Sequence, residues 1–315
     1  MKSIHVLLVW PNRPEQMAIL DNTYHLHRYD LASLSDKVAI LDEFGEQIRA
    51  VVTTHGGGLE QSLIDRLPNL EIVACSSVGL DTLCVDACKA RGIHVTNTPD
   101  VLTDDVADMA LLLLLATIRR LVPGIDWIKS GDWVKKGMMP LNTAIHSKTV
   151  GIVGLGRIGK AIASRAQAFG MKVCYYGRRQ YSDVDYTYYD DLEALARDVD
   201  ILMPAIPGGD DTEGLITRDV LKALGPKSYF INIARGSVVD EAALVELLQA
   251  GELAGAGLDV FVDEPNVPEA LLTMDNVVLQ PHCSSGTYET RGRMAQLVVD
   301  NLDAHFAGKP LLTPV

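Results

Sequence analysis

Positive charge is scarce in this sequence of 315 residues. Lysine and arginine together number 28 against 41 aspartates and glutamates, which leaves a net charge of −13. An acidic surface repels phosphate backbones and anionic headgroups, so the balance argues against nucleic acid or a membrane as a partner. An anionic ligand of this protein therefore needs a local concentration of basic groups.

Cysteine and long apolar runs are also in short supply. The five cysteines are odd in number and contain no Cys-x-x-Cys pair, so a disulfide framework or structural zinc site is not indicated. The most apolar segment, residues 109–118, is far shorter than the ~20 residues that span a bilayer. The N-terminal MKSIHVLLVWP lacks the features of a signal peptide. We therefore expect a cytoplasmic protein.

Short apolar runs alternate with helical patterns along most of the chain. Residues 4–9, 50–53, 72–75 and 150–153 are typical of buried strands, and the segments between them have helical spacing. This alternation predicts an α/β fold of parallel sheets covered by helices. Because one hydrophobic core stops growing near ~250–300 residues, we expect two doubly wound, Rossmann-like domains.

Two helices are predicted to connect these domains. The first spans residues 103–120 and is followed by Pro123-Gly124 as a stop, and the second begins near Tyr288. If the second helix returns to the first domain, residues 1–99 and 288–315 form one discontinuous domain and residues 100–287 form the other. We then expect a ligand site in the cleft between the two. The strongly apolar 103–120 helix predicts a homodimer.

The strongest local motif is VGIVGLGRIG at residues 150–159, which leaves an apolar strand and opens a helix. Its GxGxxG glycines have distinct tasks: Gly154 permits the tight turn, Gly156 the approach of a pyrophosphate, and Gly159 the close packing of helix and strand. Backbone N–H groups at the start of the helix then bind the phosphates. The motif predicts a dinucleotide site.

The end of the next strand distinguishes the two nicotinamide dinucleotides. An NAD site usually has Asp or Glu there, about 20 residues after the motif, to bind the ribose hydroxyls. This chain has Tyr176-Gly177-Arg178-Arg179 instead. Because guanidinium groups suit a 2′-phosphate, the pair favours NADP(H). The alternative is two solvated loop arginines.

Three further segments place chemically active side chains just past strand ends. They are NIARG at residues 232–236, GLDVFVDEP at 257–265 and QPHCSSGT at 280–287, and they contain Arg235, Glu264 and His282. Ligands of open α/β sheets bind at the carboxyl ends of the strands, so we expect these three to share a site.

Taken in order with residues 154–159, SSVGLD at 76–81 and Thr98-Pro99, these segments resemble the D-isomer-specific 2-hydroxyacid dehydrogenase family over nearly the whole chain. The arginine pair and the length are most similar to its glyoxylate/hydroxypyruvate reductase branch, including the plant-type hydroxyphenylpyruvate reductases. The resemblance implies that residues 1–99 and 288–315 form a flavodoxin-like substrate-binding domain and that residues 100–287 form an NADP-binding Rossmann domain, with the active site in the cleft between them. It also implies NADPH-dependent reduction of a small 2-oxo acid to a D-2-hydroxy acid.

The resemblance also implies roles for individual residues. Arg235 would clamp the substrate carboxylate, His282 would act as general acid, and Glu264 would orient His282. The N–H groups of Val78 and Gly79 would bind the same carboxylate. Asp259 would hold the nicotinamide carboxamide. The full set of implied cofactor contacts is Val106, Gly154, Leu155, Gly156, Arg157, Ile158, Gly159, Gly177, Arg178, Arg179, Ile206, Thr212, Ala234, Asp259 and Gly286.

Each catalytic residue has a structural alternative. Arg235 could be a surface arginine, Glu264 could begin a turn before Pro265, His282 could be a core histidine and Asp259 could cap a helix. No metal site is expected, because the histidines are scattered in the sequence, and His25 and His27 fall in a predicted loop.

Other functions and details stay open at this stage. An NAD(P)H-sensing corepressor-type protein, or a phosphoglycerate- or formate-type dehydrogenase, is the rival hypothesis. The chain departs from the family pattern at Cys283-Ser284 and at residues 208–210. These departures leave the specificity open, but not the reaction that the resemblance implies. The 130–148 loop, with Trp133 and Met138, could reach a partner's active site or only pack at an interface. The physiological 2-oxo acid is not determined.

Overall fold

The computed structural model describes residues 3–315, and the chain divides into two compact units. Unit 1 comprises Met1–Leu102 and Gly286–Val315, and unit 2 comprises Thr103–Ser285. These divisions lie three and two residues from the domain limits expected at 99/100 and 287/288. Within residues 3–315, no helix is both long and apolar enough to cross a membrane.

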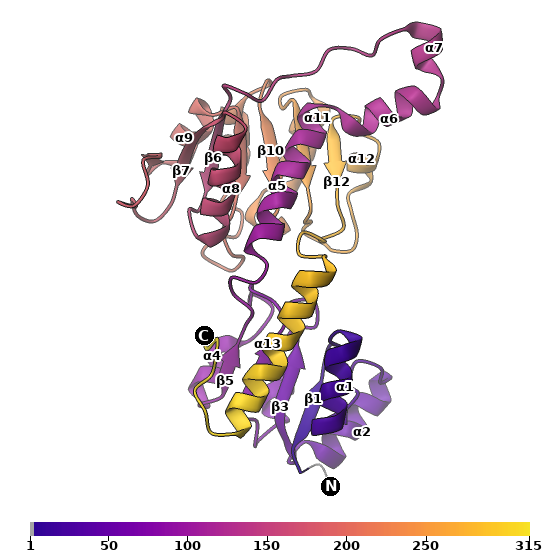
Figure 1. Cartoon of the computed structure of the whole chain (residues 1–315), viewed down its shortest axis with the longest axis vertical. Coiled ribbons are helices and arrows are strands. Elements are labelled where there is room, and N and C mark those ends of the chain that lie inside the picture. The colour runs from indigo at the N-terminus through magenta and orange to yellow at the C-terminus, as the bar shows by residue number, and fades with distance from the viewer. Residues whose placement is uncertain (1–2) are drawn as a thin grey trace. The chain divides into compact units, whose positions relative to one another are not determined.

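Unit 1 is built on a five-stranded parallel sheet in the order β2-β1-β3-β4-β5. This is the flavodoxin-like doubly wound order, whose topological switch point lies between β1 and β3. Helices cover both faces (Figure 1). The elements are β1 (His5–Leu8), α1 (Pro14–Thr23), β2 (His25–His27), α2 (Leu34–Phe44), β3 (Ile48–Thr53), α3 (Gln61–Asp65), β4 (Ile72–Cys75), α4 (Val85–Ala90), β5 (His94–Thr96) and α13 (Tyr288–Phe306).

A separate hydrophobic cluster lies on each face of this sheet. Val6 and Leu8 of β1 pack with side chains of α1 and α13, whereas Leu7 packs with Leu41 of α2. Successive residues of a strand point to opposite faces, and both faces are buried here. This double burial explains why the strands of unit 1 read as continuous apolar runs instead of alternating patterns.

Strand β2 corrects the prediction that His25 and His27 lie in a loop. The strand pairs with β1 in parallel, with His5 opposite His25 and Leu7 opposite His27. Only three residues long, it offers too little alternation to be recognised, and histidine is not a typical strand residue. The backbone hydrogen bonds to β1, a contact distant in sequence, decide its conformation.

Unit 2 contains a seven-stranded parallel sheet in the order β12-β11-β10-β9-β6-β7-β8. The order reverses between β6 and β9, which is the switch point at which Rossmann folds bind dinucleotides. The strands are β6 (Thr149–Val153), β7 (Lys172–Tyr176), β8 (Thr187–Tyr189), β9 (Ile201–Pro204), β10 (Tyr229–Asn232), β11 (Gly255–Leu258) and β12 (Val277–Leu279).

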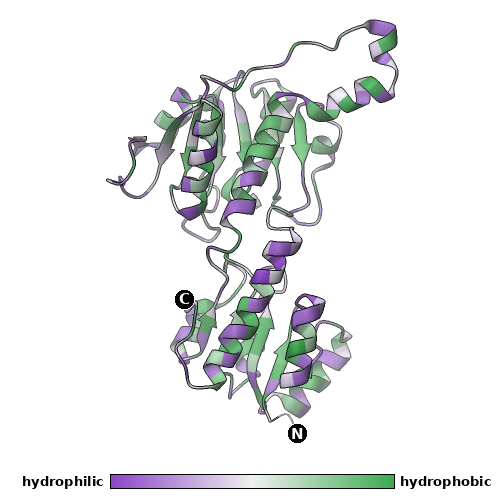
Figure 2. Cartoon of the chain, in the orientation of Figure 1, coloured by the Kyte–Doolittle hydropathy of each residue, from purple (hydrophilic) through white to green (hydrophobic). Residues whose placement is uncertain are grey.

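Helices cover both faces of the unit 2 sheet as well. Helix α5 packs on α8 and on strands β10 to β12, and a single core cluster joins α9, α10 and α11 to the other face. Figure 2 shows strands coloured mainly as hydrophobic between helices that also contain hydrophilic residues. These helices are α5 (Thr103–Ile118), α8 (Arg157–Ala168), α9 (Leu192–Asp198), α10 (Arg218–Leu224) and α11 (Glu241–Gln249), with the short η1 (Gly236–Val238) and α12 (Glu269–Leu272).

The segment after α5 differs from the prediction. The helix ends at Ile118, two residues before the expected Arg120, whose φ of 50° is left-handed. Pro123 does not stop a helix but lies in the first turn of α6 (Leu121–Lys129), where a missing N–H is tolerated. The expected 130–148 loop contains α7 (Asp132–Lys136).

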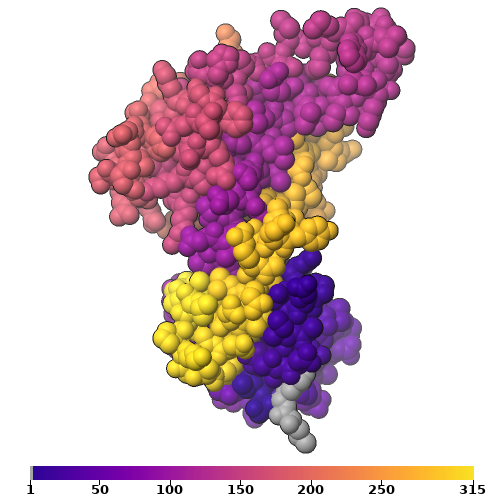
Figure 3. All heavy atoms as spheres, viewed as in Figure 1, coloured from indigo at the N-terminus to yellow at the C-terminus, as the bar shows by residue number. Residues whose placement is uncertain are grey.

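Exposed apolar side chains collect on α6, α7 and the segment that follows, and not on α5 as predicted. Nine residues of α5 are buried within unit 2, whereas neither α6 nor α7 has a buried residue. The α6–α7 segment stands out on the surface of unit 2 (Figure 3). The exposed apolar residues of α6, α7 and the segment after α7 are Leu121, Val122, Ile125, Ile128, Trp133, Val134, Met138 and Leu141.

Candidate active site

The loop between β6 and α8 gives its three glycines three different environments. Gly154 has a φ of 94°, and a Cβ there would crowd Ile206 and the carbonyl of Ala205. At Gly159 a Cβ would overlap the carbonyl oxygen of Gly154. Gly156 has no heavy atom within 4 Å of such a position, which leaves room beside the first turn of α8. The loop thus combines a tight turn, close packing and an open approach, as a bound pyrophosphate requires.

Replacing Gly159 with alanine should therefore damage this loop. The added methyl overlaps backbone, which cannot move aside as a side chain can, so we expect a loss of about 1–3 kcal/mol of stability. NADPH affinity should fall with it, as measured by thermal unfolding and by titration of NADPH fluorescence. Gly292→Ala is the matched control, because that helical glycine faces open space; it should be neutral or stabilising. Equal behaviour of the two variants would contradict the assignment.

A basic patch follows the end of β7. Arg178 and Arg179 are exposed, and the Arg179 guanidinium lies 5.1 Å from the ring centre of Tyr181. Lys160 of α8 lies over the same ring at 4.9 Å and also forms an ion pair with Asp183. The hydrogen bond that Lys160 donates to Asp183 is the main cause of the lowered pKa of Asp183. The end of β7 nearest the phosphate loop is therefore positive.

The loop after β10 is fixed by a buried amide. Asn232, which is 1% exposed, accepts a hydrogen bond from the N–H of Ala234 (3.0 Å) and donates one to the carbonyl of Arg235 (2.9 Å). The neighbouring Gly236 leaves no room for a Cβ, which would overlap the backbone of Phe261. Arg235, half-buried, donates to the carbonyl of Ala234 at 2.7 Å. The loops after β10 and β11 are thus in direct contact.

His282 and Glu264 form the central polar pair of unit 2. The Nδ1 of His282 lies 2.7 Å from Oε2 of Glu264, and the N–H of Phe261 donates to Oε1 at 3.0 Å. The imidazole is 36% exposed, which excludes a core histidine, and the carboxylate is 32% exposed. Nearby, burial raises the pKa of Glu241, and the charges of Asp263 and Glu264 act in the same direction. Glu264 therefore orients the imidazole from one side.

The backbone of His282 is in an unusual conformation that Asp259 secures. Its φ is 49°, in the left-handed region that non-glycine residues seldom adopt. The carbonyl of Asp259 accepts from His282 N at 2.8 Å, and its carboxylate accepts from Cys283 N at 2.9 Å and Ser284 N at 3.0 Å. The Ser284 hydroxyl also donates to this carboxylate. Asp259 thus holds the loop that presents the imidazole.

These contacts change the interpretation of Asp259. The residue is 0% exposed and is the N-cap of none of the helices in residues 3–315, so the helix-cap alternative is wrong. Both carboxylate oxygens are engaged by the 283–284 backbone. This pairing could not be predicted from the sequence, because Asp259 and Cys283 are 24 residues apart. The implied contact with the carboxamide stays a prediction.

Other predicted cofactor residues lie on the same edge of the unit 2 sheet. Gly177 follows β7, Ile206 follows β9 beside Gly154, and Ala234 follows β10. Val106 is buried in the first turn of α5. The Thr212 hydroxyl donates to the carbonyls of Pro207 (2.8 Å) and Gly209 (3.0 Å), so it shapes its own loop.

Val78, Gly79 and Gly286 belong to unit 1. The 76–79 loop follows β4 and is held by its neighbours. Asn97 donates to the carbonyl of Val78 at 3.0 Å, and the N–H of His55 donates to the Ser77 hydroxyl at 2.9 Å. The loop that carries the two predicted carboxylate-binding N–H groups is therefore well defined within its own unit.

Unit 1 also has a pocket that the sequence did not indicate. It encloses about 760 Å³ at the carboxyl ends of β1 and β3, the switch point of that sheet. Leu59 and Gly56-Gly57-Gly58 are among its lining residues, but Val78 and Gly79 are not.

Comparison with known proteins places this arrangement in context. The family model described as "D-isomer specific 2-hydroxyacid dehydrogenase, NAD binding domain" matches residues 111–284. The chain is 49% identical over 315 residues, the full length of both, to a glyoxylate/hydroxypyruvate reductase A of Arabidopsis thaliana. It is equally similar, over the same extent, to the hydroxyphenylpyruvate reductase of Plectranthus scutellarioides.

A solved structure extends the similarity to three dimensions. The NADPH-dependent glyoxylate/hydroxypyruvate reductase of Sinorhizobium meliloti, in complex with NADP and malonate, is 42% identical with a TM-score of 0.90. The comparison covers 99% of this chain and 97% of that one.

Proposed function

Because the chain belongs to the D-isomer-specific 2-hydroxyacid dehydrogenase family, we propose that it reduces small 2-oxo acids to D-2-hydroxy acids with NADPH. Glyoxylate and hydroxypyruvate are the expected substrates, with phenylpyruvate-type acids as a bulkier possibility. The observation that carries the proposal is the placement of Arg235, Glu264 and His282 after β10, β11 and β12. These are neighbouring strands of the sheet that also carries the phosphate loop.

Each catalytic side chain has one task in this proposal. NADPH supplies a hydride to the C2 carbonyl carbon, and the carbonyl oxygen then needs a proton. Because Glu264 engages Nδ1 of His282, we expect Nε2 to donate that proton. The Glu264 carboxylate orients the ring, and solvent reprotonates the ring after turnover.

Arg235 is the proposed anchor for the substrate. A planar guanidinium can bind the carboxylate in a bidentate manner and place positive charge beside the oxygen that becomes negative during hydride transfer. The hydrogen bond from the Asn232 amide to the Arg235 carbonyl keeps the Arg235 side chain at the end of β10. We further propose that the N–H groups of Val78 and Gly79 bind the same carboxylate.

The basic patch after β7 is proposed to select NADPH over NADH. Replacing Arg178 and Arg179 together with serine removes the charge-assisted hydrogen bonds to a 2′-phosphate. Two such bonds at roughly 1.5–3 kcal/mol each amount to about 3–6 kcal/mol, so the NADPH/NADH ratio of kcat/KM should fall by about 10²–10⁴-fold. Arg197→Ser, an exposed arginine elsewhere in unit 2, should leave the ratio unchanged. A double variant with the wild-type ratio would refute this role.

A steady-state panel tests the proposed function. NADPH consumption is followed with glyoxylate, hydroxypyruvate, phenylpyruvate and 2-oxoisocaproate, and we expect turnover with at least one of the first two. A corepressor-type sensor would bind NADPH and turn over none of the four. A phosphoglycerate-type dehydrogenase would instead prefer NADH.

We also propose that the protein is a cytoplasmic homodimer. The exposed apolar side chains of α6, α7 and the following segment offer a surface for a second copy, and all five cysteines are free thiols, as in a reducing compartment. Light scattering should give a mass of twice the 34.2 kDa of the chain. A monomer at micromolar concentration would refute the dimer.

A further inference from the structure

Three histidines that are scattered in the sequence meet on one face of the unit 1 sheet, contrary to our expectation. His5 opens β1, and His25 and His27 begin and end β2. The parallel register sets His5 opposite His25, and residues i and i+2 of a strand share a face. The fold therefore brings the three rings of this histidine cluster together.

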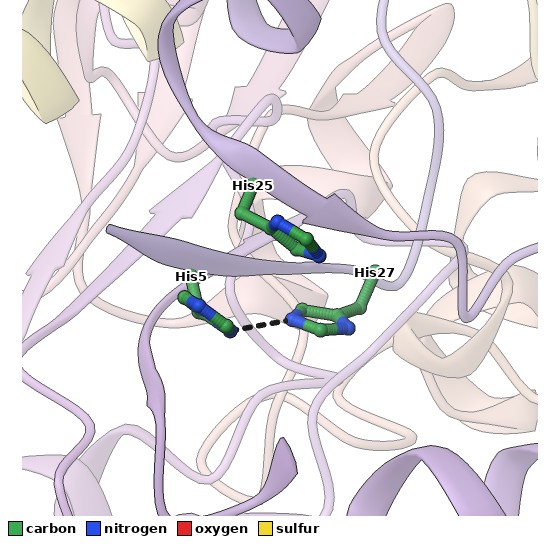
Figure 4. Close-up of side chains that lie close together, drawn as sticks. All are labelled: His5, His25 and His27. Carbon is green, nitrogen blue, oxygen red and sulfur yellow. Dashed lines mark hydrogen bonds between the residues drawn. The ribbon is translucent and has the colours of Figure 1, made fainter. Parts of the chain in front are cut away.

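The rings lie close enough to share one ligand. His5 Nδ1 is 2.9 Å from His27 Nε2, and a nitrogen from each ring lies within 4.8 Å of the others. The His5 and His25 rings are stacked, with centroids 4.6 Å apart and planes 11° apart. Figure 4 shows the three rings gathered around a small common space, with the His5–His27 hydrogen bond on one side.

The histidine cluster is buried on the side of His27 and exposed to solvent on the side of His25. His27 is 6% exposed and packs on Phe44 at the end of α2, with ring centroids 4.4 Å apart. His25 is exposed at the outer strand of the sheet. A neutral imidazole is the form that ligates metal.

We propose that the histidine cluster binds one divalent, late first-row transition-metal ion, with Zn²⁺ as the representative. The donor set consists of imidazole nitrogens, which suit Zn²⁺, Ni²⁺ or Cu²⁺ and not Mg²⁺ or Ca²⁺. At a metal–nitrogen distance of about 2.0–2.1 Å, tetrahedral ligands lie about 3.3 Å apart. The separations here, from 2.9 Å to within 4.8 Å, bracket that value. Metal binding would replace the His5–His27 hydrogen bond and rotate the stacked His5 and His25 rings so that their nitrogens converge.

The place of the cluster in the fold indicates a structural role. The cluster consists of the first residue of β1 and both terminal residues of the three-residue β2, whereas the 76–79 loop proposed to bind substrate follows β4. A metal there would fasten the three-residue outer strand β2 to β1 and to α2. Binding should thus raise thermal stability, because the ion binds only the folded arrangement, and should leave turnover unchanged.

The test is a calorimetric titration of the full, tag-free chain with Zn²⁺, together with thermal unfolding in Zn²⁺ or Mg²⁺. We expect one equivalent of Zn²⁺ per chain and a higher Tm, with no effect of Mg²⁺. His25→Gln, at the exposed position, should weaken Zn²⁺ binding at least about tenfold and remove the rise in Tm. His94→Gln is the matched control, an exposed histidine that opens β5 of the same sheet.

The outcomes separate cleanly. Loss of binding in His25→Gln with full binding in His94→Gln supports the site, and His27→Gln should repeat that loss if it folds. Absence of saturable Zn²⁺ binding in the wild type overturns the proposal, because the three rings would then only pack against one another. Undiminished binding in His25→Gln, or lost binding in His94→Gln, overturns it too, because the ion would lie elsewhere.

Discussion

Replacing His282 with alanine is expected to lower kcat by about 10²–10⁴-fold, the usual contribution of a positioned general acid. Without the ring, the alkoxide formed by hydride arrival has only water as a proton source. NADPH affinity should be retained, because His282 follows β12 whereas the phosphate loop follows β6. Stopped-flow or steady-state NADPH absorbance with hydroxypyruvate measures the loss.

Two comparisons make this result specific. His146→Ala removes an exposed histidine of unit 2 and should leave kcat unchanged. Glu264→Gln keeps the shape of the His282 partner but removes its charge, so we expect a smaller loss than for His282→Ala. Turnover of the His282 variant within about twofold of wild type would show that another group donates the proton.

Replacing Arg235 with alanine should reduce kcat/KM by a comparable factor. Two charge-assisted hydrogen bonds to the substrate carboxylate, at roughly 1.5–3 kcal/mol each, amount to about 3–6 kcal/mol, or about 10²–10⁴-fold. The loss should appear in both KM and kcat, because the guanidinium binds the substrate and stabilises the developing oxyanion. Initial rates over a range of hydroxypyruvate concentrations separate the two.

The conservative variant sharpens the test of Arg235. Arg235→Lys retains the charge but not the planar fork, so it should recover only part of the activity. Arg197→Ala, which removes an exposed arginine paired with Glu193 at 3.4 Å, should leave kcat and KM unchanged. An Arg235→Ala enzyme with wild-type KM and kcat would leave the substrate carboxylate without its proposed anchor.

The features that could be predicted from the sequence are those with local causes. Gly154 and Gly159 admit no side chain because their own loop closes on them, and a GxGxxG motif after an apolar strand expresses that constraint directly. The alternation of strands and helices likewise follows from periodicity within each segment. Arg235, Glu264 and His282 could be proposed from the sequence because each follows a strand end, and parallel strands bring such ends to one edge of the sheet; their catalytic roles stay a prediction.

The features that were missed depend on contacts between distant segments. The residues around Asp259 do not indicate that its carboxylate accepts hydrogen bonds from the 283–284 backbone, because these bonds form only when β11 and β12 lie side by side. The gathering of His5 with His25 depends on the register of two strands, one of them only three residues long. Pro123 shows a third cause: proline stops a helix from inside but not in its first turn.

The fate of the transferred hydrogen tests the central claim most directly. The enzyme is supplied with NADPH that carries deuterium at the reactive C4 position, and hydroxypyruvate is the acceptor. We predict one deuterium at C2 of the product, in the D configuration, for each NADPH consumed. A product without the label, or one of L configuration, would contradict direct hydride transfer at the site proposed to contain Arg235, Glu264 and His282.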